Sequence, residues 1–488
     1  MFNVNSNTNR QTAINESKSR LLAASVLFAS IASILAIPSS AQAACATYYV
    51  STTGKDWNLG TINSPFLSIH NAAKKLAPCD TLYVRGGIYK QTAITLINNG
   101  TESQPVKILA YPGELPILDG SGMNIGQWVS FINLDGQYIK ISGFEVRNGG
   151  TGVNVAGHHN TVSKFNVHHT INNGILAKGD YSIVEDSKVS WSCMNHYYYL
   201  TGQPNGLDGW ASGLSAARDT VDGITQHAIL RRNTVTENWG EGLSAYEADG
   251  IIMEDNIVYN KWALNVYISD ARNVILRNNM IYNTPNSKID EIGARFPDRF
   301  ASNLVLADER PDKPRSTNNI VVNNMILNGD ISAFSWSIPT DGGLYNAVIA
   351  NNTVIDGNIR TGSKNLGSVI KNNIFFTSKA GFSLATVPSR TGLSLSSNVW
   401  WPATPSNASG VGDVVGDPQV VRTGSTNSGE LAKGYFAVAP TSPAIGKGAY
   451  VSGITDDYAI SSVGASVNIG SYATQVAPFQ YVPALVVK

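Results

Sequence analysis

The chain has 488 residues, of which only 14% are charged, and its 35 basic and 35 acidic side chains balance. A nucleic-acid-binding protein needs a basic surface, so this balance argues against a nucleic-acid partner. The low charge, together with 45 glycines, indicates a chain with many turns and few solvated helices.

The first 43 residues are predicted to be an export signal. Basic residues precede an apolar stretch over 21–37, and Ala41-Gln42-Ala43 fits a small-residue cleavage site. The stretch could nearly span a bilayer as an anchor, but Pro38 and the cleavage site favour removal. We therefore expect a secreted mature protein with no membrane span after signal cleavage.

Residues 44–90 are predicted to form an N-terminal cap and the first coils of a repeat. Residues 68–77 are typical of a short amphipathic helix that Pro78 stops, and such a helix would cover the open end of the core. Cys45 and Cys79 each lie five residues before a valine. If their strands pair in parallel and in register, the sulfurs are neighbours, and an exported protein permits a disulfide. Two free thiols are the alternative, and Cys193 has no obvious partner.

Between residues 91 and 400 a short strand, a polar turn and a second short strand recur. The turn position repeats every 21–28 residues, apart from two gaps of 46 and 45 residues that are either two coils or one coil with an inserted loop. Asparagine suits tight turns and can bond to copies of itself above and below. The turn residues are Glu145, Asn166, Ser187, Asn233, Asn256, Asn279, Asn324, Asn352, Asn373 and Asn398.

This period predicts an all-β solenoid, a right-handed parallel β-helix in which alternating apolar side chains stack inward from coil to coil. A β-sandwich or a propeller is the alternative, but those folds need hairpin signals or longer periods. Beyond residue 401 the period fades, so residues 401–488 are predicted to be a C-terminal coil, cap and tail. Whether the protein oligomerises stays open.

Three segments, 242–247, 265–270 and 303–308, align as successive strands and put Glu247, Asp270 and Asp308 at one strand end. Adjacent coils lie about 4.8 Å apart, so these carboxylates would repel one another and need a cation or basic partners. Alternatively they cap turns and pair with arginines in solvent. The candidate basic partners are Arg272, Arg310 and Arg315.

Two irregular stretches, 191–223 and 284–318, bracket this acidic ladder, and long loops on a solenoid usually carry its function. Aromatic rings give sugars an apolar face, and arginine binds carboxylates through two nitrogens. The predicted substrate-binding residues are Trp210, Trp239, Tyr246, Tyr267 and Arg310.

The chain resembles the secreted right-handed β-helix proteins of the pectate-lyase-like superfamily. The resemblance rests on an opening signature at 48–54, 64–69 and 80–89 and a closing signature at 416–418, 442–448 and 468–472. Within that superfamily the stretch Asn205-Gly-Leu-Asp208-Gly-Trp210 is similar to a calcium-binding motif of the family 9 polysaccharide lyases.

The resemblance implies a polysaccharide lyase that cleaves an acidic, uronate-containing polysaccharide by β-elimination with Ca²⁺ as cofactor. In the family's next motif only Glu241 remains acidic here, because Gly240 and Ser244 replace two aspartates. The family's catalytic lysine has no matching motif, so Lys261, the closest lysine in chain order, is the predicted base. The predicted calcium ligands are Asp208, Glu241, Glu247 and Asp270.

Two other functions fit the same residues. A non-catalytic surface protein that binds or organises exopolysaccharide would need no complete calcium motif. A glycoside hydrolase needs two carboxyl groups about 5–10 Å apart, which Glu241 and Asp270 could supply.

Overall fold

The computed structural model describes residues 44–217, 223–285, 287–294, 303–336, 341–451 and 467–471. The predicted export signal therefore lies outside the described residues. The chain divides into residues 1–44 and 45–488, and the account below concerns the second unit. None of the described helices is long and apolar enough to cross a membrane.

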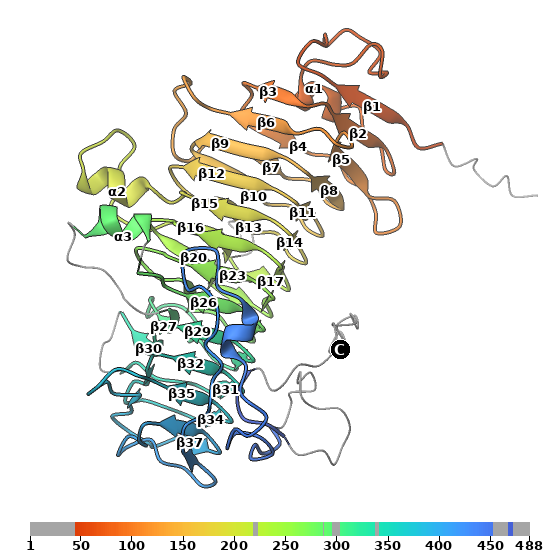
Figure 1. The fold of residues 1–488 in the computed structure, drawn as a ribbon. Coiled ribbons are helices and arrows are strands. Elements are labelled where there is room, and N and C mark those ends of the chain that lie inside the picture. The colour runs from red at the N-terminus through yellow and green to blue at the C-terminus, as the bar shows by residue number, and fades with distance from the viewer. Residues whose placement is uncertain are drawn as a thin grey trace, which may run out of the picture. The chain divides into compact units, whose positions relative to one another are not determined.

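The predicted parallel β-helix is confirmed. Each coil between the two ends contributes one strand to each of three sheets in a fixed order, and neighbouring strands of a sheet pair in parallel (Figure 1). Residues about two dozen positions apart in the sequence therefore become vertical neighbours. We call the sheets 1, 2 and 3 in the order in which the chain visits them.

Sheet 1 contains, in the described part of the chain, β1 (Thr47–Val50), β2 (Thr81–Val84), β5 (Val106–Ala110), β8 (Ile139–Ser142), β11 (Thr161–Ser163), β14 (Ile183–Glu185), β18 (Ile229–Arg231), β22 (Ile252–Glu254), β25 (Ile275–Arg277), β28 (Ile320–Val322), β31 (Val348–Ala350), β34 (Ser368–Lys371) and β37 (Leu393–Ser396).

Sheet 2 contains β3 (Gly87–Tyr89), β6 (Pro116–Asp119), β9 (Glu145–Gly149), β12 (Asn166–Thr170), β15 (Lys188–Ser190), β19 (Thr234–Thr236), β23 (Ile257–Tyr259), β26 (Met280–Tyr282), β29 (Met325–Leu327), β32 (Thr353–Ile355), β35 (Ile374–Phe376), β38 (Val399–Trp401) and β39 (Val414–Val415).

Sheet 3 contains β4 (Ile94–Leu96), β7 (Ser130–Leu134), β10 (Thr151–Val155), β13 (Ile175–Ala177), β16 (Ser212–Ala217), β20 (Glu241–Tyr246), β24 (Val266–Ser269), β27 (Leu304–Asp308), β30 (Ile331–Ser335), β33 (Ile359–Arg360) and β36 (Ala385–Thr386). A further parallel pair joins β17 (Thr225–Gln226) to β21 (Ala248–Asp249).

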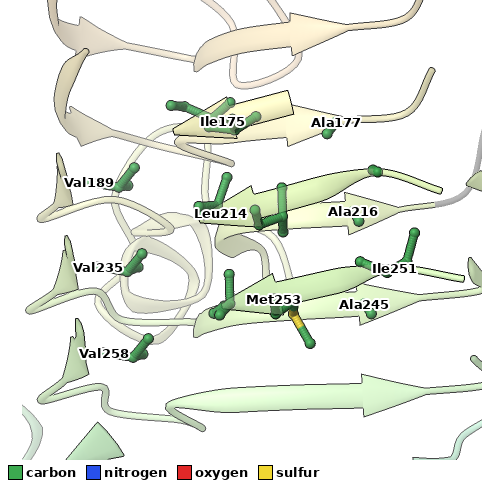
Figure 2. Close-up of a cluster of buried hydrophobic side chains, with 14 of the residues drawn as sticks. Ile175, Ala177, Val189, Leu214, Ala216, Val235, Ala245, Ile251, Met253 and Val258 are labelled. Carbon is green, nitrogen blue, oxygen red and sulfur yellow. The ribbon is translucent and has the colours of Figure 1, made fainter. Parts of the chain in front are cut away.

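The core runs along the inside of the coil and consists of aliphatic side chains from all three sheets. Figure 2 shows how like residues stack: Leu214 lies below Ile175 on sheet 3, and Val189, Val235 and Val258 form a column on sheet 2. All five are fully buried. Burying such a side chain contributes about 1.5–3 kcal/mol, so the repeated column stabilises every coil against its neighbours.

An asparagine ladder runs along the turn between sheets 1 and 2. From Asn233 to Asn373 each side-chain amide donates to the amide oxygen of the ladder residue on the next coil at 2.9–3.1 Å, and Asn398 is the last acceptor. The ladder residues are fully buried, or nearly so, and the left-handed backbone belongs instead to the residue before each of them, such as Asn278 with φ 59°. The turn thus needs two polar residues, one for its backbone and one for the ladder.

The two long gaps in the repeat are single coils with inserted loops. β15 pairs directly with β19, and β26 pairs directly with β29. The first insert carries α2 (Asn195–Leu200) and the second carries α3 (Lys288–Gly293), both between sheet 2 and sheet 3. The two helices lie side by side at one edge of the solenoid (Figure 1).

The N-terminal end has the predicted helix, and of the two alternatives left open for Cys45 and Cys79 the structure has the disulfide. α1 (Ile69–Ala73) begins at Ser68, whose hydroxyl accepts from the Asn71 amide. It buries Ile69 and both alanines against the core. β1 and β2 pair in register, and Cys45 is bonded to Cys79.

The C-terminal segment does more than cap the last coil. Residues 414–448, here called the strap, begin with β39, the last strand of sheet 2, and then run back over the outer face of that sheet, with η2 (Lys433–Phe436) among them (Figure 1). Phe436 and Val438 of the strap are buried against Tyr282, Met325 and other outward side chains of that sheet. The apolar outer face of sheet 2 is the reason the strap lies there rather than over the end.

Candidate functional site on sheet 3

The acidic ladder predicted from the sequence exists. In the register of β20, β24 and β27, Tyr246 pairs with Ser269 and Ser269 with Ala307, so the residues that follow them, Glu247, Asp270 and Asp308, stack on three consecutive coils. All three carboxylates are at least nine-tenths buried. Each meets groups of the protein that compensate its charge, as buried charges require.

Glu247 faces two cations. The Nε atom of Arg310 lies 3.5 Å from its Oε1, and the Nζ atom of Lys313 lies 3.5 Å from its Oε2. Glu247 is 2% exposed, whereas the Arg310 side chain is 43% exposed. The buried carboxylate therefore anchors a guanidinium whose outer side stays open to solvent.

Arg310 also binds a tyrosine. Its Nε donates to the Tyr246 hydroxyl at 2.9 Å. Burial raises the pKa of Tyr246, the nearby Glu309 carboxylate adds to the rise, and Arg310 opposes it. Tyr246 thus keeps its proton at neutral pH and presents a half-buried hydroxyl beside an exposed cation.

Glu241, at the start of β20, is the carboxyl group with the most strongly altered acidity in this area. Its Oε2 accepts from the Ser212 hydroxyl at 2.7 Å, and Ser212 is bonded in turn to Ser244. Burial raises the pKa of Glu241 to about 8, and the Glu309 carboxylate adds to this rise. A group that titrates near neutral pH can accept or donate a proton during a reaction.

Asp270 and Asp308 have mainly structural partners. Asp270 accepts from the backbone amides of Glu309 and Arg310 at 3.2–3.4 Å, and burial raises its pKa to about 6. Asp308 is bound by Arg315, with the shortest N–O distance at 2.7 Å. The expected pairing of the ladder with arginines is therefore found for Arg310 and Arg315, while Arg272 pairs with Asp249 instead.

Of the four predicted aromatic contacts, two lie at the surface. Tyr246 is half-buried, and Trp210 is half-buried with its ring perpendicular to that of Trp262. Tyr267 is only 3% exposed, and its hydroxyl lies between Glu309 and the Trp336 indole. Tyr267 thus has a packing role below the surface, where its hydroxyl holds Glu309 and Trp336 in place.

Trp239 cannot present a face to sugar in this structure because it is fully buried. It stacks on Trp262 with a centroid distance of 4.5 Å, and its Nε1 donates to His196 Nδ1 at 3.1 Å. Ile289 of α3 and Tyr197 of α2 pack on the same pair. These aromatic residues hold the two inserts together, which is a packing role.

Lys261 lies inside the coil rather than at its surface. It is 1% exposed, and its Nζ donates to the Tyr259 carbonyl at 2.8 Å. A Cβ on Gly242 would come within 2.8 Å of Lys261 Cε, so the lysine runs directly beneath β20. Burial lowers its pKa, but its position does not fit a base that must touch a polymer.

The four predicted calcium ligands do not come together. Asp208 is 75% exposed on the first insert, where its Oδ1 lies 3.8 Å from His196 Nε2. The others are bound as described above, and no group of three or more His, Cys, Asp or Glu side chains in the described residues could hold a metal ion. Calcium prefers several carboxylate and carbonyl oxygens, so these donors do not fit one calcium site.

Sequence reasoning missed three members of the cluster: Glu309, Lys313 and Trp336. Glu309 and Lys313 lie one and five residues after Asp308, whose position the register gives, so the register could have suggested them. Trp336 follows β30, one coil further on. Its indole reaches Tyr267 across 69 residues of chain, a contact that no repeat pattern encodes.

Comparison with known proteins shows sequence similarity to pectate lyases. The profile of the family described as "Pel9A-like, right handed beta helix region" matches residues 48–277. Pectate lyase L of Paenibacillus polymyxa is 29% identical over 177 residues, which cover 34% of this chain and 38% of that protein. Pectate lyase PEL9 of Emericella nidulans is 42% identical over 76 residues, 15% of this chain and 18% of that protein. The matches thus span less than half of the length of these relatives.

Solved structures agree on the fold. The crystal structure of pectate lyase Pel9A matches with a TM-score of 0.55 and 20% identity, over 88% of this chain and 96% of that one. A complex of XylC with xylose matches with a TM-score of 0.53 and 11% identity, over 76% and 87% of the two chains. In fold the chain is a right-handed parallel β-helix, and over residues 48–277 its sequence is similar to the Pel9A-like family.

Proposed function

We propose that this protein is a polysaccharide lyase that acts on a uronate-containing polymer by β-elimination, with its reaction centre at the outer face of β20, β24 and β27. The observation that carries the proposal is the Arg310–Tyr246 pair. The exposed guanidinium of Arg310 forms an ion pair with the buried Glu247 and donates a hydrogen bond to the protonated Tyr246 hydroxyl. The similarity to pectate lyases over the N-terminal half supports the same reaction class.

The reaction needs a cationic partner for the sugar carboxylate, a proton acceptor and a proton donor. Arg310 and Lys313 would bind the carboxylate and stabilise the negative charge that develops beside it. The Glu241 carboxylate would take the proton from C5 of the uronate. As the C4–C5 double bond forms and the C4–O4 bond breaks, Tyr246 would give its proton to the leaving oxygen.

These roles use only the protein's own residues. The predicted calcium ligands do not gather, so no step of the proposal depends on Ca²⁺, and Ca²⁺ enters the experiment as a variable. Glu241 replaces Lys261 as the proposed base because Lys261 is enclosed beneath β20.

We also propose that the protein works outside the cytoplasm. The Cys45–Cys79 disulfide supports this, since such bonds persist in oxidising compartments. A test is to express the full chain in a bacterial host and sequence the N-terminus of the protein recovered outside the cytoplasm. A new N-terminus at Ala44 agrees with export and cleavage, whereas retention of residues 1–43 contradicts them.

A glycoside hydrolase would need one protonated and one ionised carboxyl at neutral pH. With pKa values raised to about 8 and about 6, Glu241 is mostly protonated and Asp270 mostly ionised at pH 7, so the pair meets that requirement. Asp270, however, accepts hydrogen bonds from the backbone amides of Glu309 and Arg310. Its burial and its amide donors leave no open face towards a sugar. The enclosure of Asp270, rather than its pKa, therefore favours elimination over hydrolysis at this site.

The deciding experiment incubates the mature protein with a panel of uronate polymers, in parallel with added Ca²⁺ and with a chelator. An ultraviolet-absorbing unsaturated product supports the lyase. New reducing ends without that absorbance would show a hydrolase, and retention of the polymer without either change would show a binding protein. Activity that survives the chelator agrees with the roles given to Arg310 and Lys313.

A further inference from the structure

A second groove lies away from the Arg310 cluster, between the strap and the edge where sheet 2 turns into sheet 3. Its volume is about 620 Å³, which falls within the usual range of about 300–1,000 Å³ for ligand sites. The solenoid contributes Asn328, Asp330, Arg360, Lys379 and Phe382, and the strap contributes Tyr435. We propose that this groove is a second saccharide site, which binds a short neutral stretch of glycan through its hydroxyl groups and without reaction.

The charges of the groove are balanced in pairs. Arg360 Nε lies 2.6 Å from Asp330 Oδ2, and Lys379 Nζ lies 3.9 Å from Asp356 Oδ2. Two cations against two carboxylates leave no net field that would draw in a polyanion. In this the groove differs from the surface around Arg310 and Lys313, where cations face outward above a buried carboxylate.

The same pairs are well suited to hydroxyl groups. The side chains of Arg360 and Lys379 are 55% and 51% exposed, so their remaining N–H groups are open to a ligand. Asn328 lies beside them, and its amide oxygen accepts from Lys379 Nζ at 3.5 Å. A sugar hydroxyl both donates and accepts, and it can use a neighbouring guanidinium and carboxylate at once.

Apolar surface lies beside these polar groups. Phe382 is half-buried and packs against the core on one side, and Leu327 is buried in the same wall. The half-buried Tyr435 ring faces the groove from the strap. Rings of this kind pack against the C–H face of a sugar, so polar and apolar groups together match a pyranose better than they match a free ion.

The walls of the groove are held in place before any ligand arrives. Phe436, next to Tyr435, is fully buried against sheet 2. The Tyr435 carbonyl accepts from the Arg422 amide at 3.0 Å, and Ser428 donates to the buried Glu237 at 3.1 Å. A preformed site lowers the entropy cost of binding, so a small ligand can bind here with measurable affinity.

The test is calorimetric titration of the intact protein, without turnover, with neutral xylose, arabinose and galactose oligomers and with oligogalacturonate in the presence of chelator. We expect a neutral oligomer to bind with an affinity that changes little between low and moderate salt. Phe382→Leu keeps apolar packing and removes the ring, and Arg360→Ala removes a paired donor. Each should weaken binding at least tenfold.

Arg272→Ala is the matched control, since Arg272 forms a similar half-exposed pair with Asp249 at 2.7 Å, outside the groove, and it should leave binding unchanged. Thermal melts of all variants check that they fold. The proposal is overturned if no neutral oligomer binds, if the groove variants bind as the wild type does, or if the groove prefers oligogalacturonate in a salt-sensitive way. Since the readout is binding, its failure is distinct from an absence of lyase activity.

Discussion

The Nε atom of Arg310 donates to the hydroxyl of Tyr246 at 2.9 Å, although 64 residues separate the two in the chain. They meet because Tyr246 ends a strand of sheet 3 and Arg310 follows the strand two coils further on, above the carboxylate of Glu247. This relationship makes Arg310 the first residue to test.

Replacing Arg310 with alanine should lower lyase activity about 10²–10³-fold, since one preorganised group that stabilises developing charge is lost. The activity of Arg310→Lys should lie between those of the alanine variant and the wild type, because lysine keeps the positive charge but lacks the planar guanidinium group. Initial rates of unsaturated product formation measure both. Arg272→Ala serves as the control with wild-type rates, and full activity in Arg310→Ala would remove Arg310 from the reaction.

The rate should rise with pH through about 8 if Glu241 is the base, because only its ionised form accepts a proton and burial raises its pKa to about 8. Glu241→Gln should lower the activity about 10²–10⁴-fold, the usual contribution of a general base. The residual rate of this variant should not rise with pH through about 8. A pH–rate profile of kcat on both proteins checks the assignment. An unchanged profile in the glutamine variant would contradict it.

The same carboxyl should affect stability in the opposite direction. Between the ordinary pKa of 4.5 and about 8, the folded protein holds a proton that the unfolded chain has released, so stability falls as pH rises through this window. Asp270 acts in the same way only up to about pH 6. The change in unfolding free energy between pH 6 and 8.5 should therefore be smaller in Glu241→Gln, as measured by denaturant titration. Equal slopes in the two proteins would argue against the raised pKa.

The asparagine ladder should be costly to interrupt. Asn279 donates to the Met253 carbonyl and to Asn324, and it accepts from the backbone and the side chain of Asn256. Asn279→Ala leaves several of these buried groups without a partner and should cost about 3–5 kcal/mol of unfolding free energy, at roughly 1–3 kcal/mol for each group. Asn133→Ala, on the outer face of sheet 3, should cost less than about 1 kcal/mol. Similar losses of unfolding free energy in the two variants would contradict a special contribution of the asparagine ladder to stability.

Glu237 should hold the strap and the second insert to the coil. Its carboxylate accepts from Ser428 of the strap, from Ser287 and from the Ile289 amide of α3. In Glu237→Ala, limited proteolysis followed by mass spectrometry should show faster cleavage within 414–448, because local unfolding of that segment becomes easier. Glu185→Ala, which removes partly buried ion pairs on sheet 1, away from the strap, should leave the cleavage rate unchanged. Strap cleavage at equal rates in both variants would show that other contacts suffice.

Much of this protein follows from its sequence because repetition determines vertical neighbours. Once residues about two dozen positions apart must stack, the ladder of Glu247, Asp270 and Asp308 follows from register alone. Register also makes Cys45 and Cys79 neighbours, and the structure decided that they form a disulfide and not two free thiols. The parallel coil, the capping helix and the asparagine stack follow in the same way, since each depends on strand period and turn chemistry.

Tertiary structure decided what the period does not encode. Inserted loops have no register, so only packing could show that Trp239 is enclosed by the two inserts and that Asp208 lies exposed beside His196. Whether a polar side chain faces in or out at a turn depends on local backbone shape, which is how Lys261 came to lie beneath Gly242. The strap runs back along sheet 2 because that face is apolar and needs a cover, and this return creates the second groove.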